Sequence, residues 1–168
     1  SVPSSATFNT ILRSATLAAP VSHVTSGMIR SLTILDTILL NGCECEPYLT
    51  ADHRVMLEQT EELFEGLRII AKAINAPKIY VGIEENKPDA IEKMEEFSAK
   101  NGGDIEIVPL KMKYPQGDEK QLLKAVLGKE IPSGKLPIAI GAVVSNIGTV
   151  KAVYDAVALG KPLYERVV

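Results

Sequence analysis

The fold of this chain is decided by the stretch LDTILLNGCECEP, residues 35–47. Residues 35–40 form an apolar run of strand length, and Asn41-Gly42 is a pair that commonly ends a strand. Further strands are predicted at residues 78–83 and 104–109. The near-continuous apolar run at residues 138–144 predicts a fourth strand, buried on both faces.

Amphipathic segments separate these strands. Apolar residues recur at helical spacing from residue 52 to residue 74, which predicts one long helix with its glutamates on other faces. Shorter helices are predicted at 88–100, opened by Pro88, at 118–127, and from Ser145-Asn146 through residue 158. This alternation predicts an α/β fold, a Rossmann-like layered fold with a mostly parallel sheet, whose ligands bind beyond the carboxyl ends of the strands.

Composition narrows the class of protein. The chain has 168 residues, 46% hydrophobic and 23% charged, enough for one core without metal or disulfide staples. Its net charge of −3 and the absence of a basic block argue against nucleic acid as a partner. No apolar stretch reaches the roughly 20 residues of a membrane span. With only two cysteines, a reducing compartment fits best.

The first 34 residues differ from the rest. They contain twelve Ser or Thr, no acidic residue and two arginines. This composition is similar to that of a transit peptide. A binding loop rich in backbone contacts and a remnant of cloning are the alternatives.

Three predicted strand ends collect small, acidic and amide residues: 41–47, 114–120 and 145–149. In extended backbone Glu44 and Glu46 would point the same way, where they could accept hydrogen bonds from ribose hydroxyls or an amide, or bind metal. A solvated acidic loop is the alternative. Gly117 begins a helix that could bind an anion, although Asp118 and Glu119 are also ordinary residues for a helix start.

The remaining candidates have equally plain alternatives. Residues 145–149 form either an N-cap or a ligand-facing amide and hydroxyl pair. Cys43 and Cys45 have the spacing of metal ligands, but such sites usually need four ligands and the sequence offers no further cysteines. We therefore expect buried, inert thiols and no metal site.

Five strings together carry a family resemblance. They are NGCECEPYLTADHR (41–54), VGIEENKP (81–88), KYPQGDEKQL (113–122), SNIGT (145–149) and GKPLYERVV (160–168). In this order the chain resembles the RnfC family of the Rnf electron transport complex, which is similar to the NADH- and FMN-binding flavoprotein subunit of respiratory complex I. The resemblance implies the FMN-binding-domain fold of that flavoprotein subunit.

The resemblance also implies a function. A member of this family takes hydride from NADH onto FMN and passes electrons to iron–sulfur clusters, so that the flavin carries the chemistry. It works in a membrane-bound, ion-translocating ferredoxin:NAD+ oxidoreductase, with ferredoxin as an indirect partner and the other subunits as direct ones. The domain itself is expected to be soluble and peripheral, on the cytoplasmic face.

The family's site residues transfer by motif. FMN contacts are implied for Asn41, Glu44, Tyr114, Gly117, Asp118, Asn146, Thr149, Ser4 and Ser5. NADH contacts are implied for Glu46, Glu119, Phe8 and Lys135.

Two departures from the family affect this expectation. The family's glycine-rich loop, G-x-G-G-A-T-F-P-T, aligns with VPSSATFNT (2–10), in which all three glycines are replaced. The expected organisation is an atypical segment at 1–34, then an NADH/FMN-binding domain at 35–162. Residues 163–168 are expected to start the family's β-rich domain, which its cysteine-rich cluster modules follow. The alternatives are a docking or assembly domain without flavin, and an Rnf-like electron carrier for a soluble reductase.

Overall fold

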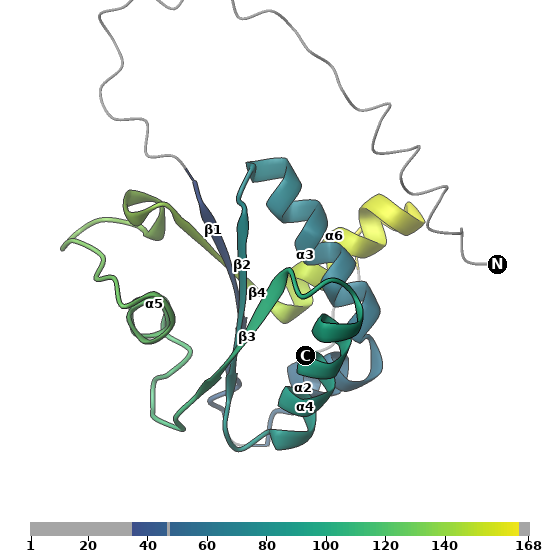
Figure 1. The fold of residues 1–168 in the computed structure, drawn as a ribbon, viewed down its shortest axis with the longest axis horizontal. Coiled ribbons are helices and arrows are strands. Elements are labelled where there is room, and N and C mark those ends of the chain that lie inside the picture. Colours follow the sequence, from purple (N-terminus) through teal and green to yellow (C-terminus); the bar gives the residue numbers. More distant parts are fainter. Residues whose placement is uncertain (1–34, 47, 165–168) are drawn as a thin grey trace, which may run out of the picture. The chain divides into compact units, whose positions relative to one another are not determined.

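The computed structural model describes residues 35–46 and 48–164. Four parallel strands form one sheet in the order β3-β2-β1-β4 (Figure 1). The strands are β1 (Thr37–Gly42), β2 (Lys78–Glu84), β3 (Ile105–Leu110) and β4 (Ala142–Asn146). Because β1 pairs with both β2 and β4, it lies inside the sheet, and its apolar run is buried there.

Helices cover the two faces of the sheet unequally. Helices α2 (Ala51–Glu58), α3 (Thr60–Ile74), α4 (Pro88–Lys100) and α6 (Ile147–Leu159) lie on one face. Helix α5 (Glu119–Leu127) lies on the other, where a short 3₁₀ helix, η1 (Pro137–Ile140), leads into β4 (Figure 1). The predicted layered α/β fold with a parallel sheet is confirmed.

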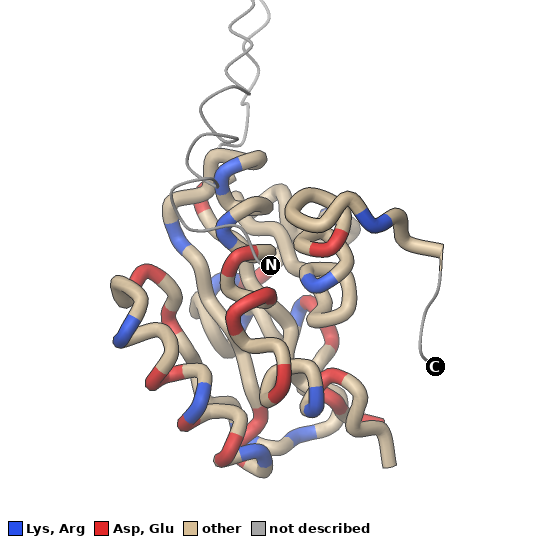
Figure 2. Tube along the Cα trace, turned by 90° about the vertical axis from the view of Figure 1, so that its right-hand side faces the viewer, with Lys and Arg blue, Asp and Glu red and all other residues tan. Residues whose placement is uncertain are grey.

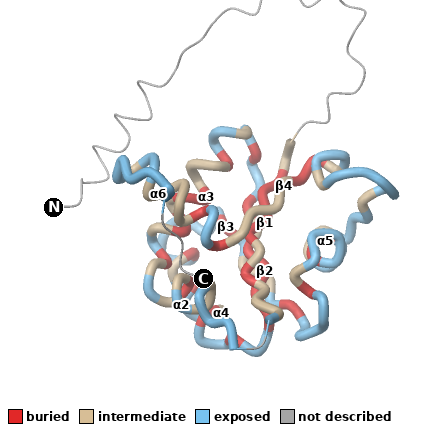
Figure 3. Tube along the Cα trace, turned by 180° about the vertical axis from the view of Figure 1, so that it is seen from behind, coloured by how far each residue is buried: buried red, intermediate tan, exposed pale blue. Residues whose placement is uncertain are grey.

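Alternation along β1 divides the core in two. Ile38 and Leu40 pack with α2, α3 and α4 residues in the larger cluster, and Leu39 packs with Leu122 and Leu123 of α5 in the smaller one. Successive side chains of a strand point to opposite faces, so a single buried strand serves both clusters. Figure 3 shows the buried positions concentrated along β1 and β2, with exposed positions on the outer side of α5.

The predicted helix at 52–74 is wrong as a single element, because it is divided at Gln59. Gln59 has φ −130° and ψ 37°, outside the helical region, and separates α2 from α3. The Thr60 hydroxyl donates to the Met56 carbonyl oxygen at 2.6 Å, and the amide of Leu63 donates to the Gln59 carbonyl oxygen at 3.1 Å to begin α3. Helical spacing of apolar residues continues across this break, so periodicity alone does not reveal it.

The strand predicted at 138–144 is wrong in its first half. Residues 137–140 form η1, and Gly141, with φ +80°, turns the chain into β4. Only Ala142 of β4 is buried, because β4 is an edge strand, so the expectation of burial on both faces is also wrong. The first strand is shifted as well: β1 starts at Thr37 and includes Asn41 and Gly42, which pair with β2.

Other predicted elements are confirmed within a residue or two. Helix α4 begins at Pro88 and ends at Lys100, and the strands at 78–83 and 104–109 correspond to β2 and β3. Acidic and basic residues are interspersed along the helices in Figure 2. Among the described residues, none of the helices has both the length and the apolar character that crossing a membrane requires. The domain boundaries after residues 34 and 162 stay predictions.

Candidate functional site

The carboxyl ends of the parallel strands bring separate parts of the sequence together. Strands β1, β2 and β4 end at Gly42, Glu84 and Asn146, and parallel strands place these ends at one edge of the sheet. A pocket of about 290 Å³ opens at this edge. Its lining residues are Glu44, Cys45, Glu84, Asn86, Met112, Lys113 and Tyr114.

Gly117 is held against the loop after β1 by two hydrogen bonds. The Asn41 side-chain amide donates to the Gly117 carbonyl oxygen at 2.9 Å, and the Gly117 amide donates to Cys45 Sγ at 3.3 Å. Asn41 Oδ1 accepts from the Cys43 amide at 3.1 Å, which fixes the Asn41 side chain. A Cβ on Gly117 would lie 3.4 Å from both the Cys43 carbonyl oxygen and Cys45 Sγ. These hydrogen bonds join residues that are separated by 72 and 76 positions in the sequence. Asn41, Cys45 and Gly117 therefore form one structural unit.

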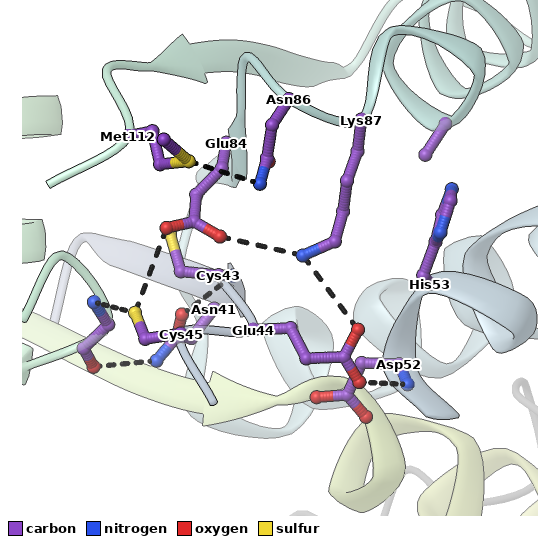
Figure 4. Close-up of polar contacts among 12 residues, drawn as sticks. Asn41, Cys43, Glu44, Cys45, Asp52, His53, Glu84, Asn86, Lys87 and Met112 are labelled. Carbon is purple, nitrogen blue, oxygen red and sulfur yellow. Dashed lines mark hydrogen bonds and ion pairs between the residues drawn. The ribbon is translucent and has the colours of Figure 1, made fainter. Parts of the chain in front are cut away.

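A buried charged triad lies beside this unit (Figure 4). Lys87 Nζ is 3.5 Å from Glu84 Oε2 and 3.8 Å from Glu44 Oε2. The side chains of Glu44, Glu84 and Lys87 are 6%, 3% and 9% exposed. Glu44 Oε1 accepts from the Asp52 amide at 3.0 Å, whereas Glu44 Oε2 has no hydrogen-bond donor among the described residues. A buried carboxylate oxygen in this state is an acceptor available to a ligand.

The two cysteines are free and half-buried, so the expectation of fully buried thiols is wrong. The Cys45 thiol donates to Glu84 Oε1 at 3.7 Å. Burial, the negative charge of Glu84 and that of Cys45 raise the pKa of Cys43 to about 12, against a smaller opposing effect of Lys87. Cys43 therefore stays a thiol at neutral pH and is a poor nucleophile. Within 35–46 and 48–164, no three metal-ligating side chains converge.

Glu44 and Glu46 do not project together, contrary to the expectation from extended backbone. Glu44 is buried, whereas Glu46 is exposed and begins a turn in which the Leu49 amide donates to the Glu46 carbonyl oxygen at 3.3 Å. Tyr48 in this turn has φ +69°. The loop after β1 is irregular, so alternation of side chains, which holds only in a strand, does not apply.

The starts of α5 and α6 are capped by side chains, whereas those of α2 and α4 are not. Asp118 accepts from the amides of Lys120 and Gln121 at 3.1 and 3.3 Å, which occupies the donors that an anion would use at the start of α5. Asn146 accepts from the Gly148 amide at 2.9 Å, so the cap interpretation of residues 145–149 is confirmed. The Asn146 side-chain amide also donates to Asp52 Oδ2 at 3.0 Å, which joins β4 to α2.

The other predicted site residues are spread more widely. Tyr114 lines the pocket and is 82% exposed. Glu119 and Thr149 are exposed at the starts of α5 and α6, and Lys135 is exposed in the loop before η1 and is not among the lining residues. Ser4, Ser5 and Phe8 lie outside the described residues.

Sequence reasoning missed Glu84, Lys87 and Asp52 as members of this site. The signal was present in part, because Glu84 ends an apolar run and Lys87 belongs to a string that carried the family resemblance. One pattern would have found Glu84. It is a charged residue at the end of a buried strand, next to a strand whose own end carries acidic residues.

Comparison with known proteins identifies the family. A family model described as the Nuo51 FMN-binding domain matches residues 7–155. The chain belongs to this family. The match begins at residue 7, after the three positions aligned above with the family's glycines.

Individual relatives agree with this assignment and with the predicted resemblance to RnfC. The C component of the proton-translocating ferredoxin:NAD(+) oxidoreductase complex of Clostridium ljungdahlii is 52% identical over 133 residues, 79% of this chain and 29% of that protein. Its Na(+)-translocating counterpart from Acetobacterium woodii is 46% identical over 79% of this chain and 30% of that protein. The C component of the ion-translocating oxidoreductase complex of Rhodobacter capsulatus is 43% identical over 83% of this chain and 27% of that protein. This Nuo51-family chain thus spans less than a third of these curated relatives.

A solved structure shows the same fold. The NAD+-reducing [NiFe]-hydrogenase in its air-oxidized state matches with a TM-score of 0.64 and 22% identity, over 72% of this chain and 24% of that one. At this identity the match supports the Nuo51-family fold alone.

Proposed function

We propose that the chain is the FMN- and NADH-binding domain of the RnfC component of an ion-translocating ferredoxin:NAD+ oxidoreductase complex. The names of its relatives support the complex, and the family description supports FMN. One observation of the structure carries the proposal. The strings predicted to bind the cofactor meet at one edge of the sheet, where Asn41 and Gly117 are hydrogen bonded and Glu44 presents a buried acceptor that lacks a donor among the described residues.

The described residues fit the polar part of a flavin. The ribityl chain of FMN carries hydroxyl donors, and Glu44 Oε2 is the kind of buried acceptor that such a donor would satisfy. A Cβ on Gly117 would contact the loop after β1 at ordinary van der Waals distance, so a larger side chain there would press on that loop. Asn146, Thr149 and Asp118 flank this edge from α6 and α5.

Each residue then has a definable task. Bound FMN would supply the chemistry, because it is the group that accepts hydride from NADH. Asn41 holds Gly117 in place, since both ends of its side-chain amide are already used within the protein. Glu46 and Glu119 are exposed near the two loops and are proposed to accept hydrogen bonds from NADH. Tyr114 and Lys135 are proposed to contact the cofactor and the nucleotide, respectively. Contacts of Ser4 and Ser5 with FMN and of Phe8 with NADH stay predictions from the family resemblance, because these residues lie outside the described part of the chain.

The wider assignment follows from the relatives. Such a complex would use this domain at the cytoplasmic face of a membrane, peripheral to the other subunits. Electrons would continue to iron–sulfur clusters outside this chain and from there exchange with ferredoxin. Ferredoxin and the ion-translocating complex are proposed from the names of the Clostridium and Acetobacterium proteins, and the iron–sulfur clusters and the cytoplasmic face from the resemblance to the RnfC family.

We expect Glu46→Gln and Glu119→Gln to slow reduction of the FMN-loaded chain by NADH, with FMN affinity within about twofold of the wild type. Loss of one charge-assisted hydrogen bond corresponds to about 1.5–3 kcal/mol, roughly a tenfold or greater effect on the NADH-dependent step. Anaerobic stopped-flow bleaching of flavin absorbance, at varied NADH concentration, measures it.

Glu92→Gln, on the exposed side of α4, is the matched control and should leave the rate unchanged. If either site variant loses FMN as strongly as it loses NADH reactivity, its assignment to NADH is wrong. If the FMN-loaded wild type is not reduced by NADH at all, the proposed function itself is wrong.

A further inference from the structure

Lys87 is a buried lysine to which the proposed function gives no task. Its side chain is only 9% exposed, and lysines are almost never buried unless they are paired. Its partners are the two carboxylates nearest the pocket, Glu84 and Glu44, with Nζ to Oε2 distances of 3.5 and 3.8 Å. Glu44 and Glu84 line the pocket, and Lys87 contacts both without being among the lining residues.

The backbone makes this arrangement. Glu84 is the last residue of β2, and the Lys87 amide donates to the Glu84 carbonyl oxygen at 3.0 Å, which closes a tight turn. Lys87 is also the residue before Pro88, at the start of α4. The turn brings two side chains three positions apart together, and Glu44 joins them from the loop after the neighbouring strand β1 (Figure 4).

The charges of the triad do not balance. Two carboxylates face one ammonium group, so the triad carries one net negative charge, and all three side chains are at least nine-tenths buried. Without Lys87, two carboxylates would lie together in a buried site with no counter-charge, an arrangement that is strongly unfavourable. Lys87 is thus the group on which the charge of the pocket wall depends.

We propose that Lys87 is a positioning residue that fixes the charge of the flavin pocket, by supplying the counter-charge to the buried carboxylates of Glu44 and Glu84. This inference rests on the proposed function, because it concerns the same pocket. FMN is itself anionic, so the number of negative charges beside the pocket bears directly on its binding. The charges of the triad also act on a neighbouring group, since Glu84 raises the pKa of Cys43 and Lys87 lowers it.

Other titratable groups surround the triad and must be separated from it. Asp52 donates its amide to Glu44, Cys45 donates to Glu84, and His53 Nε2 lies 2.9 Å from Asp89 Oδ1 across α2 and α4. Lys113, Tyr114 and Cys43 are further charged or titratable neighbours. These groups and the phosphate of FMN are common to the wild type and the variants below, so a loss of affinity that appears in Lys87→Met and disappears in the double variant reports on the triad.

The test compares four variants with the wild type. Lys87→Met removes the charge with similar length, and Lys87→Arg keeps it. The double variant Glu84→Gln with Lys87→Met removes one charge of each sign and restores the net charge of the triad, while the amide oxygen can still accept from Cys45. Lys100→Met, whose exposed lysine pairs with Glu96 on the same helix, is the control.

FMN dissociation constants are measured by fluorescence titration at pH 6 and pH 8, together with urea unfolding of the flavin-free proteins between pH 4.5 and 8. For Lys87→Met we expect FMN affinity to fall at least about tenfold at pH 8, and by less at pH 6, where the FMN phosphate carries less negative charge. Lys87→Arg, the double variant and Lys100→Met should bind with nearly wild-type affinity at both pH values.

The urea unfolding measurements also have an expected direction. Lys87→Met leaves two buried carboxylates without a counter-charge, so it should unfold at a lower urea concentration than the wild type, and the double variant should recover part of the difference. The inference is overturned if Lys87→Met binds like the wild type, or if the double variant fails to restore affinity. If wild-type protein does not bind FMN, the proposed function fails, and the inference then stands or falls on the unfolding difference alone.

Discussion

Replacing Gly66 by valine is expected to lower the free energy of unfolding by about 3 kcal/mol, the upper part of the usual range for an overpacked core. Gly66 lies where α3 meets α6, and a Cβ there would lie 2.5 Å from the Val150 carbonyl oxygen and 2.9 Å from Val150 Cγ1. Because the nearer atom is backbone, relief requires the helices to separate. Urea unfolding followed by circular dichroism measures the effect.

The control for Gly66→Val addresses helix propensity. Ala73→Gly, at an exposed position of the same helix, should cost about 1 kcal/mol from propensity alone. Gly66→Ala should also destabilise, although alanine is the better helix former, because its Cβ meets the same oxygen. A Gly66→Ala protein more stable than the wild type would show that the close approach of α3 and α6 is not as described.

Replacing Gly117 by valine is expected to weaken FMN binding by about 100-fold, equivalent to about 2.7 kcal/mol. Its Cβ would already lie 3.4 Å from the Cys43 carbonyl oxygen and Cys45 Sγ, so the additional methyl groups force the loop away. This breaks the hydrogen bonds from Asn41 and to Cys45 and displaces Asp118 and Glu119 together. Fluorescence titration with FMN measures the loss.

Two variants bracket this result. Gly117→Ala, whose Cβ makes ordinary contacts, should lose much less affinity than Gly117→Val. Gly103→Asn changes a glycine with φ +64° at the opposite edge of the sheet, where nothing lies within 4 Å, and should not alter FMN affinity. An unchanged FMN affinity in a folded Gly117→Val protein would remove Gly117 from the site.

The sequence predicted the class of fold because its strongest signals are local. The apolar run that became β1 and the Pro88 helix start are readable from neighbouring residues. The failures arose where local signals are ambiguous: η1 and β4 share one apolar run, and only the turn at Gly141 separates them. Likewise nothing in the spacing of apolar residues reveals that Gln59 leaves the helix.

The sequence predicted which segments form the site, but not the contacts between their residues. Residues 41–47, 114–120 and 145–149 were predicted as strand-end segments, and their described residues lie at or after the ends of parallel strands, which meet at one edge. Their internal bonding could not be derived, since the Gly117 contacts with Asn41 and Cys45 depend on how loops pack. The pairing of Lys87 with Glu44 joins residues 43 positions apart, and only the neighbouring positions of β1 and β2 in the sheet bring them together.

An FMN titration of the whole 168-residue chain, by flavin fluorescence and calorimetry, tests the central claim most directly. The cofactor contacts, the NADH assignment and the charge-setting role of Lys87 all concern one pocket and one ligand. The account predicts binding at micromolar or lower concentration, equivalent to about 8 kcal/mol or more, with one FMN per chain. No saturable binding at FMN concentrations of about 1 mM, equivalent to a free energy weaker than about 4 kcal/mol, would contradict it.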